Sequence, residues 1–280
     1  TIGDRVMAPN HAVAHPAATV MLLRNGAAGL EVFMVVRHDA IDFASGAVVF
    51  PGGRADPGDY EIAERPELCP AVAGLDTMQL ALRVAAIRET FEESGILLAR
   101  PRGSNALVTG ERLHEIEAAQ RAPLCQQRVR FTDILLAEKL VVASDLLVPF
   151  AHWITPSNQA KRYDTHFFLA VAPRDQVGVH DGTESVDSLW ISPAAALEGV
   201  RVGRYKMVFP THMNLTKLGR AGTADAAIAI ARRSRIVTVE PVPLRSEGGR
   251  RQLRIPAEAD YGGEIFTVTL PPAMPKPAAE

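Results

Sequence analysis

The chain has 280 residues, of which 47% are hydrophobic and 22% charged, so it is long enough to bury a substantial core as one elaborated domain. Its net charge of -2 and pI near 6.4 provide no extended basic surface, which argues against nucleic-acid and membrane partners. Two cysteines, no apolar run near the roughly 18 residues that span a bilayer, and no signal-peptide pattern at the start indicate a cytoplasmic protein.

The N-terminal part of the chain predicts a loose arm followed by short strands. Residues 1–16 form the arm, since they combine prolines with scattered polar groups. Two β-branched, apolar runs, 17–23 and 31–37, are separated by a Gly-containing turn and predict a hairpin. A further short strand over 47–50 ends at a turn that contains Gly52 and Gly53. Such a turn lets backbone carbonyls approach a ligand or a metal ion closely.

A helix is predicted over residues 78–94, after a polar stretch (54–75) that reads as a loop with one helical turn. Asp76 or Thr77 supplies an N-cap, and Gly95 stands where a helix-terminating glycine belongs. Leu80, Val84, Ile87 and Phe91 follow a helical period, so one face of this helix should pack on a core.

The last turns of this helix carry an acidic face. Glu89, Glu92 and Glu93 stand at positions i, i+3 and i+4, so the three carboxylates lie close together and repel one another. They also oppose the helix dipole, which favours cations at a C-terminal end. A divalent cation, which prefers carboxylate oxygens, would remove both penalties.

The remaining sequence alternates helical and strand patterns. Along 162–172, polar residues at 162, 164 and 166 alternate with apolar ones, which predicts either a strand that lines a cleft or a half-solvated edge strand. Ser192 and Pro193 form a helix N-cap pair. We expect helices over 111–121, 131–140, 194–198, 212–218 and 223–233, strands over 146–150, 152–154, 162–172 and 184–191, and β-rich segments over 236–270.

Two segments of the chain together resemble the signature of Nudix hydrolases, Gly-x5-Glu-x7-Arg-Glu-U-x-Glu-Glu-x-Gly-U. They are Gly53-x5-Asp59 and Arg88-Glu89-x-x-Glu92-Glu93-x-Gly95-Ile96. Asp59 replaces the usual Glu, and Thr90 replaces the usual aliphatic residue. The stretch 60–87 has 28 residues where the pattern has 7, which leaves 21 extra residues. In the family the first acid pairs with the motif arginine, so the resemblance implies that Asp59 braces Arg88.

The run 43–54, the long insertion and Trp153-Ile154-Thr155-Pro156 are similar to the Nudix subgroup that includes the peroxisomal acyl-CoA diphosphatases. The superfamily resemblance covers roughly 17–198. It implies an α+β fold, an α/β/α sandwich with a mixed β-sheet. We therefore divide the chain into an arm (1–16), a Nudix domain (17–200, with the insertion at about 60–80) and a helical and β extension (201–280) packed on the same domain.

The resemblance also implies a metal-dependent active site. Glu89, Glu92 and Glu93 would be the ligands of Mg²⁺, or of Mn²⁺, with the Gly53 carbonyl as a further ligand. Arg88 would orient the carboxylates through charge-assisted hydrogen bonds. The general base of such enzymes is either a motif glutamate or an acid on a later loop, and Glu184 is our candidate for the second.

A substrate of this kind carries phosphates and a base or an acyl group, which basic and aromatic side chains can bind. We expect a nucleoside diphosphate linked to another moiety, with CoA or acyl-CoA first. ADP-ribose or a nucleotide sugar is the alternative substrate, and a non-catalytic ligand-binding module or a homodimer built through 201–280 also remains open. The candidate substrate contacts are Arg37, Phe43, Arg54, Trp153, Arg162 and His166.

Overall fold

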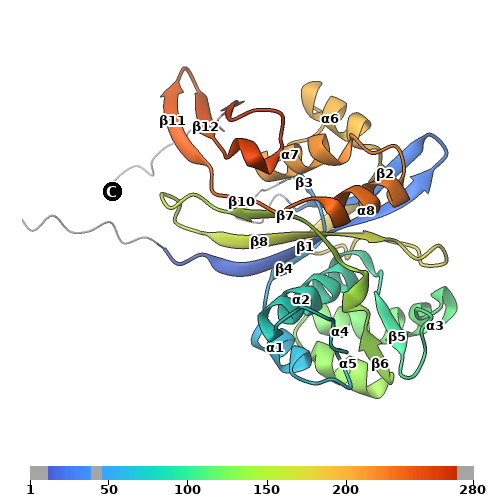
Figure 1. The fold of residues 1–280 in the computed structure, drawn as a ribbon. Coiled ribbons are helices and arrows are strands. Elements are labelled where there is room, and N and C mark those ends of the chain that lie inside the picture. Colours follow the sequence, from blue (N-terminus) through green and yellow to red (C-terminus); the bar gives the residue numbers. More distant parts are fainter. Residues whose placement is uncertain (1–11, 39–45, 270–280) are drawn as a thin grey trace, which may run out of the picture.

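The computed structural model describes residues 12–38 and 46–269, and in this part of the chain a mixed eight-stranded sheet lies between two layers of helices (Figure 1). The sheet order is β10-β7-β8-β1-β2-β3, with β4 paired to β1 and β9 paired to β2. These strands are β1 (His15–Gly26), β2 (Gly29–Arg37), β3 (Val48–Val49), β4 (Gly52–Arg54), β7 (Val148–Ile154), β8 (Tyr163–Val171), β9 (Ser185–Ile191) and β10 (Thr238–Val239).

Strand β1 organises the sheet because it pairs with three other strands. It forms the predicted hairpin with β2, runs parallel to β8 and antiparallel to β4. Ala18 is opposite Gly53 on one side and opposite His166 on the other. Gly52 and Gly53 were expected in a turn, but they belong to a strand, since the backbone of β1 supplies their pairing partners.

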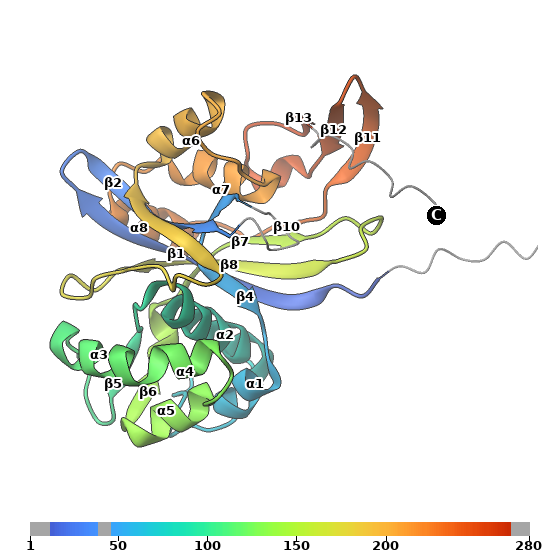
Figure 2. The same cartoon turned by 180° about the vertical axis from the view of Figure 1, so that it is seen from behind.

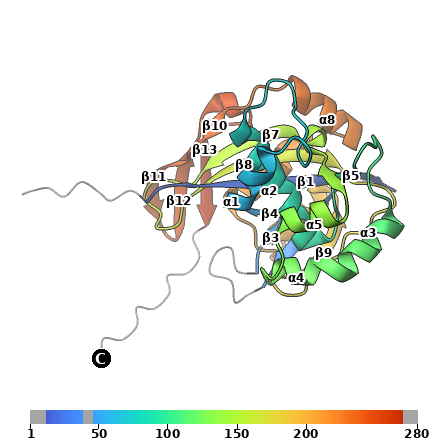
Figure 3. The ribbon, with the colours of Figure 1, turned by 90° about the horizontal axis from the view of Figure 1, so that it is seen from below.

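One face of the sheet is covered by the layer that contains the acidic helix (Figure 3). Helix α2 spans Thr77–Ser94, and its N-cap Asp76 and left-handed Gly95 (φ 74°) confirm both predicted ends. The predicted apolar stripe is buried against Ala18, Val20 and Leu22 of β1. The other elements of this layer are α1 (Pro57–Ala63), β5 (Ala99–Pro101), α3 (Gly110–Ile116), the π-helical turn η1 (Glu117–Arg121), α4 (Ala122–Cys125), α5 (Phe131–Ala137), β6 (Leu140–Val142) and the 3-10 turn η2 (Ser144–Leu146).

The opposite face is covered by the C-terminal elements (Figure 2). β10 joins the main sheet beside β7, and helices α7 and α8 bury apolar side chains against Met21 and Leu23 of β1. These elements are α6 (Pro193–Arg201, with the predicted cap Ser192), α7 (Phe209–Leu218), α8 (Ala224–Arg233), the strands β11 (Val242–Glu247), β12 (Arg250–Arg254) and β13 (Ile265–Thr269), and the 3-10 turn η3 (Ala257–Ala259).

The α/β/α sandwich with a mixed sheet is thus confirmed, whereas several boundaries differ from expectation. His15 and Pro16 belong to β1, because they pair with β8, and the rest of the predicted arm up to residue 11 lies outside the described residues. The insertion contributes to the core, since Leu68 and Cys69 are buried against the α2 layer. Among the described residues, no helix is both long and apolar enough to cross a bilayer.

Candidate active site

The three motif glutamates lie in the last turns of α2, facing β4. The Gly52 N–H donates to Glu93 Oε2 at 3.0 Å, which connects the helix to the strand. A Cβ atom at Gly53 would come within 2.5 Å of the Glu89 carboxyl carbon. A side chain at position 53 would therefore displace the Glu89 carboxylate, and the glutamates and the Gly53 backbone form one compact group.

Arg88 holds this group from behind. Its guanidinium is buried and donates from Nε to Asp59 Oδ1 and from Nη2 to Asp59 Oδ2, both at 2.9 Å. Nη1 donates to Glu89 Oε1 at 2.7 Å and to Glu92 Oε1 at 3.0 Å, and Nη2 also reaches the Arg54 carbonyl at 2.9 Å. One arginine thus fixes two glutamates and the end of β4.

The pairing implied between Asp59 and Arg88 is present, although aspartate is shorter than the usual glutamate. Asp59 is 1% exposed and lies in the first turn of α1, where its Oδ2 also accepts the Asp56 N–H at 2.8 Å. Helix α1 packs directly on α2. The helix brings the carboxylate to the guanidinium, so the shorter side chain suffices.

The carboxylates are crowded and shielded from water. Burial raises the pKa of all three, to about 7 for Glu89 and well above its ordinary value for Glu93, and the Glu89 charge adds to the rise at Glu93. Arg88 opposes the rise at Glu89 and Glu92, and Arg37, 3.9 Å from Glu93, opposes it there. Because their raised pKa values favour protonation, the three carboxylates suit a hard divalent cation, whose positive charge takes the place of the protons.

Two of the other predicted residues lie at this group. Arg37 of β2 forms the long ion pair with Glu93, and its buried Nε has no hydrogen-bond partner among residues 12–38 and 46–269. Glu184 lies just before β9 with its side chain exposed, and its charge raises the pKa of both Glu92 and Glu93. A catalytic role for Glu184 stays a prediction.

The next substrate candidates, Arg54 and Arg162, have side chains that contact residues other than the motif glutamates. Arg54 is exposed beside Gly53, and its Nη2 lies 3.3 Å from His15 Nδ1. Arg162 uses its guanidinium on Glu240 and on the carbonyls of Thr155 and Ala12. Phe43 lies outside the described residues.

Trp153 was wrongly expected to contact substrate. Its ring is 3% exposed on the opposite face of the sheet, and its Nε1–H donates to the Tyr261 hydroxyl at 2.9 Å and is 3.3 Å from Asn214 Oδ1. The residue is part of the core under α7, because successive residues of β7 point to opposite faces.

His166 lies on the α2 face of β8, which is a central strand between β7 and β1 and not the edge strand that was one of the two alternatives. Burial, together with the neighbouring His152, lowers the pKa of His166 to about 4. The ring is therefore neutral at pH 7 and offers a phosphate a hydrogen bond but no charge. His152 was not among the predicted site residues. It lies directly opposite His166, because β7 and β8 pair as antiparallel strands.

The sequence model of the NUDT19 Nudix domain family matches residues 75–218. A crystal structure of a Nudix hydrolase from Alicyclobacillus acidocaldarius is 31% identical, with a TM-score of 0.65, and the match covers 78% of this chain and 96% of that one. The chain therefore belongs to the Nudix hydrolases, within the NUDT19 Nudix domain family.

Relatives from several vertebrates carry the name acyl-coenzyme A diphosphatase NUDT19. The one from Gallus gallus is 27% identical over 290 residues, which cover 85% of this chain and 76% of the relative. The one from Xenopus laevis is 26% identical over 233 residues, which cover 70% of this chain and 61% of the relative. The matched region is thus less than two thirds of the frog protein.

The close approach at Gly53 gives a testable prediction. Gly53→Ala should lower the rate of hydrolysis by about 10²-fold, because the added methyl group displaces the Glu89 carboxylate by up to an ångström. Gly58→Ala is the matched control, since a Cβ there meets no described residue within 4 Å, and its rate should equal that of the wild type. Equal rates for all three proteins, measured under saturating substrate, would contradict this view of Gly53.

Proposed function

We propose that the chain is a Mg²⁺-dependent diphosphatase that cleaves the diphosphate of CoA or acyl-CoA. The observation that carries the proposal is the grouping of Glu89, Glu92 and Glu93 against Gly53 with Arg88 behind them. The names of the chicken and frog relatives support the substrate class. Mn²⁺ is an alternative ion, and cytoplasmic location, the homodimer and the three-part division of the chain stay predictions.

Hydrolysis adds the oxygen of water to one phosphorus atom, breaks the P–O bond of the anhydride and requires a group that takes the proton of the attacking water. Bound Mg²⁺ would be held by Glu89, Glu92 and Glu93 and would supply positive charge against the phosphoryl oxygens. Arg88 fixes two of these carboxylates, so their positions do not have to reorganise during the reaction. Glu184 is the candidate that accepts the proton.

A cavity lined by Arg54, the residue that follows Gly53, supports a substrate with several phosphates. It has a volume of about 420 Å³ and is lined in part by His15, Arg54 and Lys161. CoA carries a 3′-phosphate besides its diphosphate, and dephospho-CoA lacks it. We assign the cavity to that additional phosphate, since charged hydrogen bonds recognise such a group.

The test is product analysis with a substrate panel. Purified protein with Mg²⁺ is offered CoA, an acyl-CoA, dephospho-CoA, ADP-ribose, NADH and a diadenosine polyphosphate. CoA cleavage should release 3′,5′-ADP and phosphopantetheine, whereas preferential turnover of ADP-ribose would move the assignment to the alternative substrate class. Folded protein without turnover of any compound would refute the enzymatic proposal and favour a binding module.

The cavity assignment is tested separately with Arg54→Ala. We expect kcat/KM to fall about tenfold for CoA and little for dephospho-CoA, because one charged hydrogen bond to the 3′-phosphate is lost. Arg65→Ala removes an arginine that pairs with Glu67 instead, and it should leave both values unchanged. An equal loss on both substrates in Arg54→Ala would contradict the assignment.

A further inference from the structure

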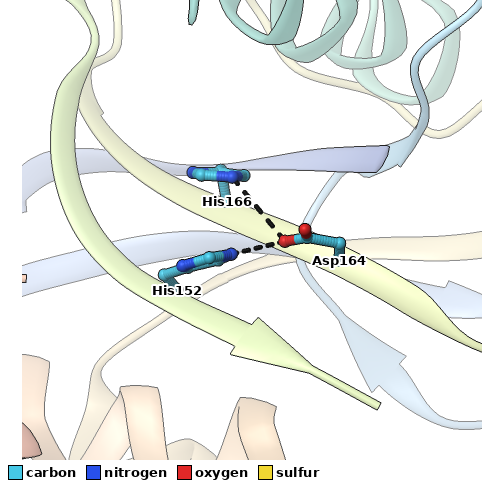
Figure 4. Close-up of side chains that lie close together, drawn as sticks. All are labelled: His152, Asp164 and His166. Atoms are coloured by element: carbon cyan, nitrogen blue, oxygen red, sulfur yellow. Dashed lines mark hydrogen bonds and ion pairs between the residues drawn. The ribbon is translucent and has the colours of Figure 1, made fainter. Parts of the chain in front are cut away.

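Two histidines and an aspartate converge on the α2 face of the sheet, outside the group of motif glutamates. His152 Nε2 contacts Asp164 Oδ1, and His166 Nε2 lies 3.7 Å from the same oxygen (Figure 4). One side-chain ligand atom from each residue lies within 4.8 Å of the other two. Two imidazole nitrogens and a carboxylate oxygen therefore face one small volume.

The strand pairing brings these residues together. His152 on β7 is the direct partner of His166 on β8. Asp164 precedes His166 by two residues, so both side chains lie on the same face of β8. The adjacent strand β10 contributes Thr238, whose hydroxyl lies 2.8 Å from His152 Nδ1. Three neighbouring strands thus build the cluster, and their backbone hydrogen bonds hold it on a rigid support.

The hydroxyl of Thr238 orients the ring of His152. Contact at Nδ1 leaves Nε2 directed at Asp164, and a hydrogen bond at the other ring nitrogen is how proteins orient the histidine ligands of metal ions. The rings of His152 and His166 stack with centroids 4.1 Å apart and planes 20° apart, so their Nε2 atoms point to the same side (Figure 4).

We propose that His152, Asp164 and His166 bind one divalent transition-metal ion of the zinc type. Imidazole and carboxylate are donors that such ions accept, and three protein ligands leave a fourth position open. Tetrahedral zinc holds its ligand atoms roughly 3.4 Å apart, with each imidazole lone pair directed at the ion. The stacked rings of His152 and His166 must therefore tilt toward each other when the ion binds. The side chains of His152, Asp164 and His166 are 17%, 35% and 35% exposed, so an ion can reach them from solvent.

This metal site is distinct from the motif carboxylates. Gly53 and His166 are both partners of Ala18, so they lie two strand spacings apart, about 10 Å. The motif group offers oxygen atoms only, whereas the histidine cluster offers mainly nitrogen, and Mg²⁺ prefers oxygen. The charge of Arg83, which packs over the Phe168 ring, acts on His166 from the α2 side. We therefore expect weaker binding than at a four-ligand structural zinc site.

The test uses Co²⁺ alone as the probe, with the full chain freed of metal by a chelator. Co²⁺ in this mixed nitrogen and oxygen site should give visible absorption bands that saturate at one equivalent, disappear on addition of Zn²⁺ and persist in excess Mg²⁺. Glu93→Gln should retain the bands, because it changes only the motif carboxylates. His166→Ala and Asp164→Asn should each weaken Co²⁺ binding by at least tenfold.

His212→Ala is the matched control, since it removes an exposed imidazole on α7, away from the cluster, and it should bind Co²⁺ like the wild type. Thermal unfolding without metal establishes that each variant is folded. Zn²⁺ should raise the melting temperature of the wild type and of His212→Ala but not that of His166→Ala. Equal Co²⁺ spectra in the wild type and His166→Ala, or no saturable binding by folded wild type, would overturn the proposal. Neither result depends on hydrolysis.

Discussion

Glu93→Gln is expected to lower kcat by about 10³-fold. The glutamate is 4% exposed and lies between the Gly52 N–H and the other motif carboxylates, so its charge cannot be replaced by water. Glutamine keeps the shape and can still accept the Gly52 hydrogen bond, but it is a poor ligand for Mg²⁺. Without a properly bound Mg²⁺, the transition state loses several kcal/mol of stabilisation, which corresponds to the fall in kcat of about 10³-fold.

The same variant should not be less stable without metal. Burial already raises the pKa of Glu93, and a neutral amide costs less to bury than a carboxylate, so the melting temperature in chelator should stay equal or rise. Glu111→Gln on the exposed start of α3 is the control and should leave both quantities unchanged. Activity above a tenth of the wild-type value in Glu93→Gln would show that Glu93 is not a required ligand.

Asp59→Asn is expected to destabilise the protein by about 3 kcal/mol and to reduce activity. The substitution leaves the buried guanidinium of Arg88 with a single weak acceptor in place of a bidentate carboxylate. The loss of unfolding free energy should lie at the lower end of the range measured for broken buried ion pairs, because other acceptors remain. Arg88 still donates to Glu89, to Glu92 and to the Arg54 carbonyl. Denaturant unfolding gives the free energy, and initial rates give the activity.

Asp56→Asn separates this specific pairing from a general effect of negative charge. Asp56 approaches Arg88 at 3.7 Å, but its side chain is 65% exposed, so water screens the pair. Its loss should cost less than about 1 kcal/mol. If Asp56→Asn and Asp59→Asn were equally destabilising, the brace would depend on total charge near α1 and not on the bidentate contact.

The features that depend on residues close in the chain were predictable. The capped ends of α2, its apolar stripe and its acidic face follow from helical spacing and from the conformations that Asp76 and Gly95 favour. The β1–β2 hairpin follows from its turn in the same way. These local rules, joined to the resemblance in the motif, led from sequence to the family and to the metal-binding glutamates as a hypothesis.

Other features depended on which strands pair, and only the tertiary structure decided them. Asp59 reaches Arg88, 29 residues away in the sequence, because α1 packs on α2. Trp153 and His152 are adjacent in sequence but face opposite sides of the sheet, one in the core and one in the cluster with Asp164. A strand residue's face follows from register, and register is fixed by hydrogen bonds between distant segments and by burial of the two apolar faces. Sequence periodicity records the alternation along β7, but not which side α2 covers.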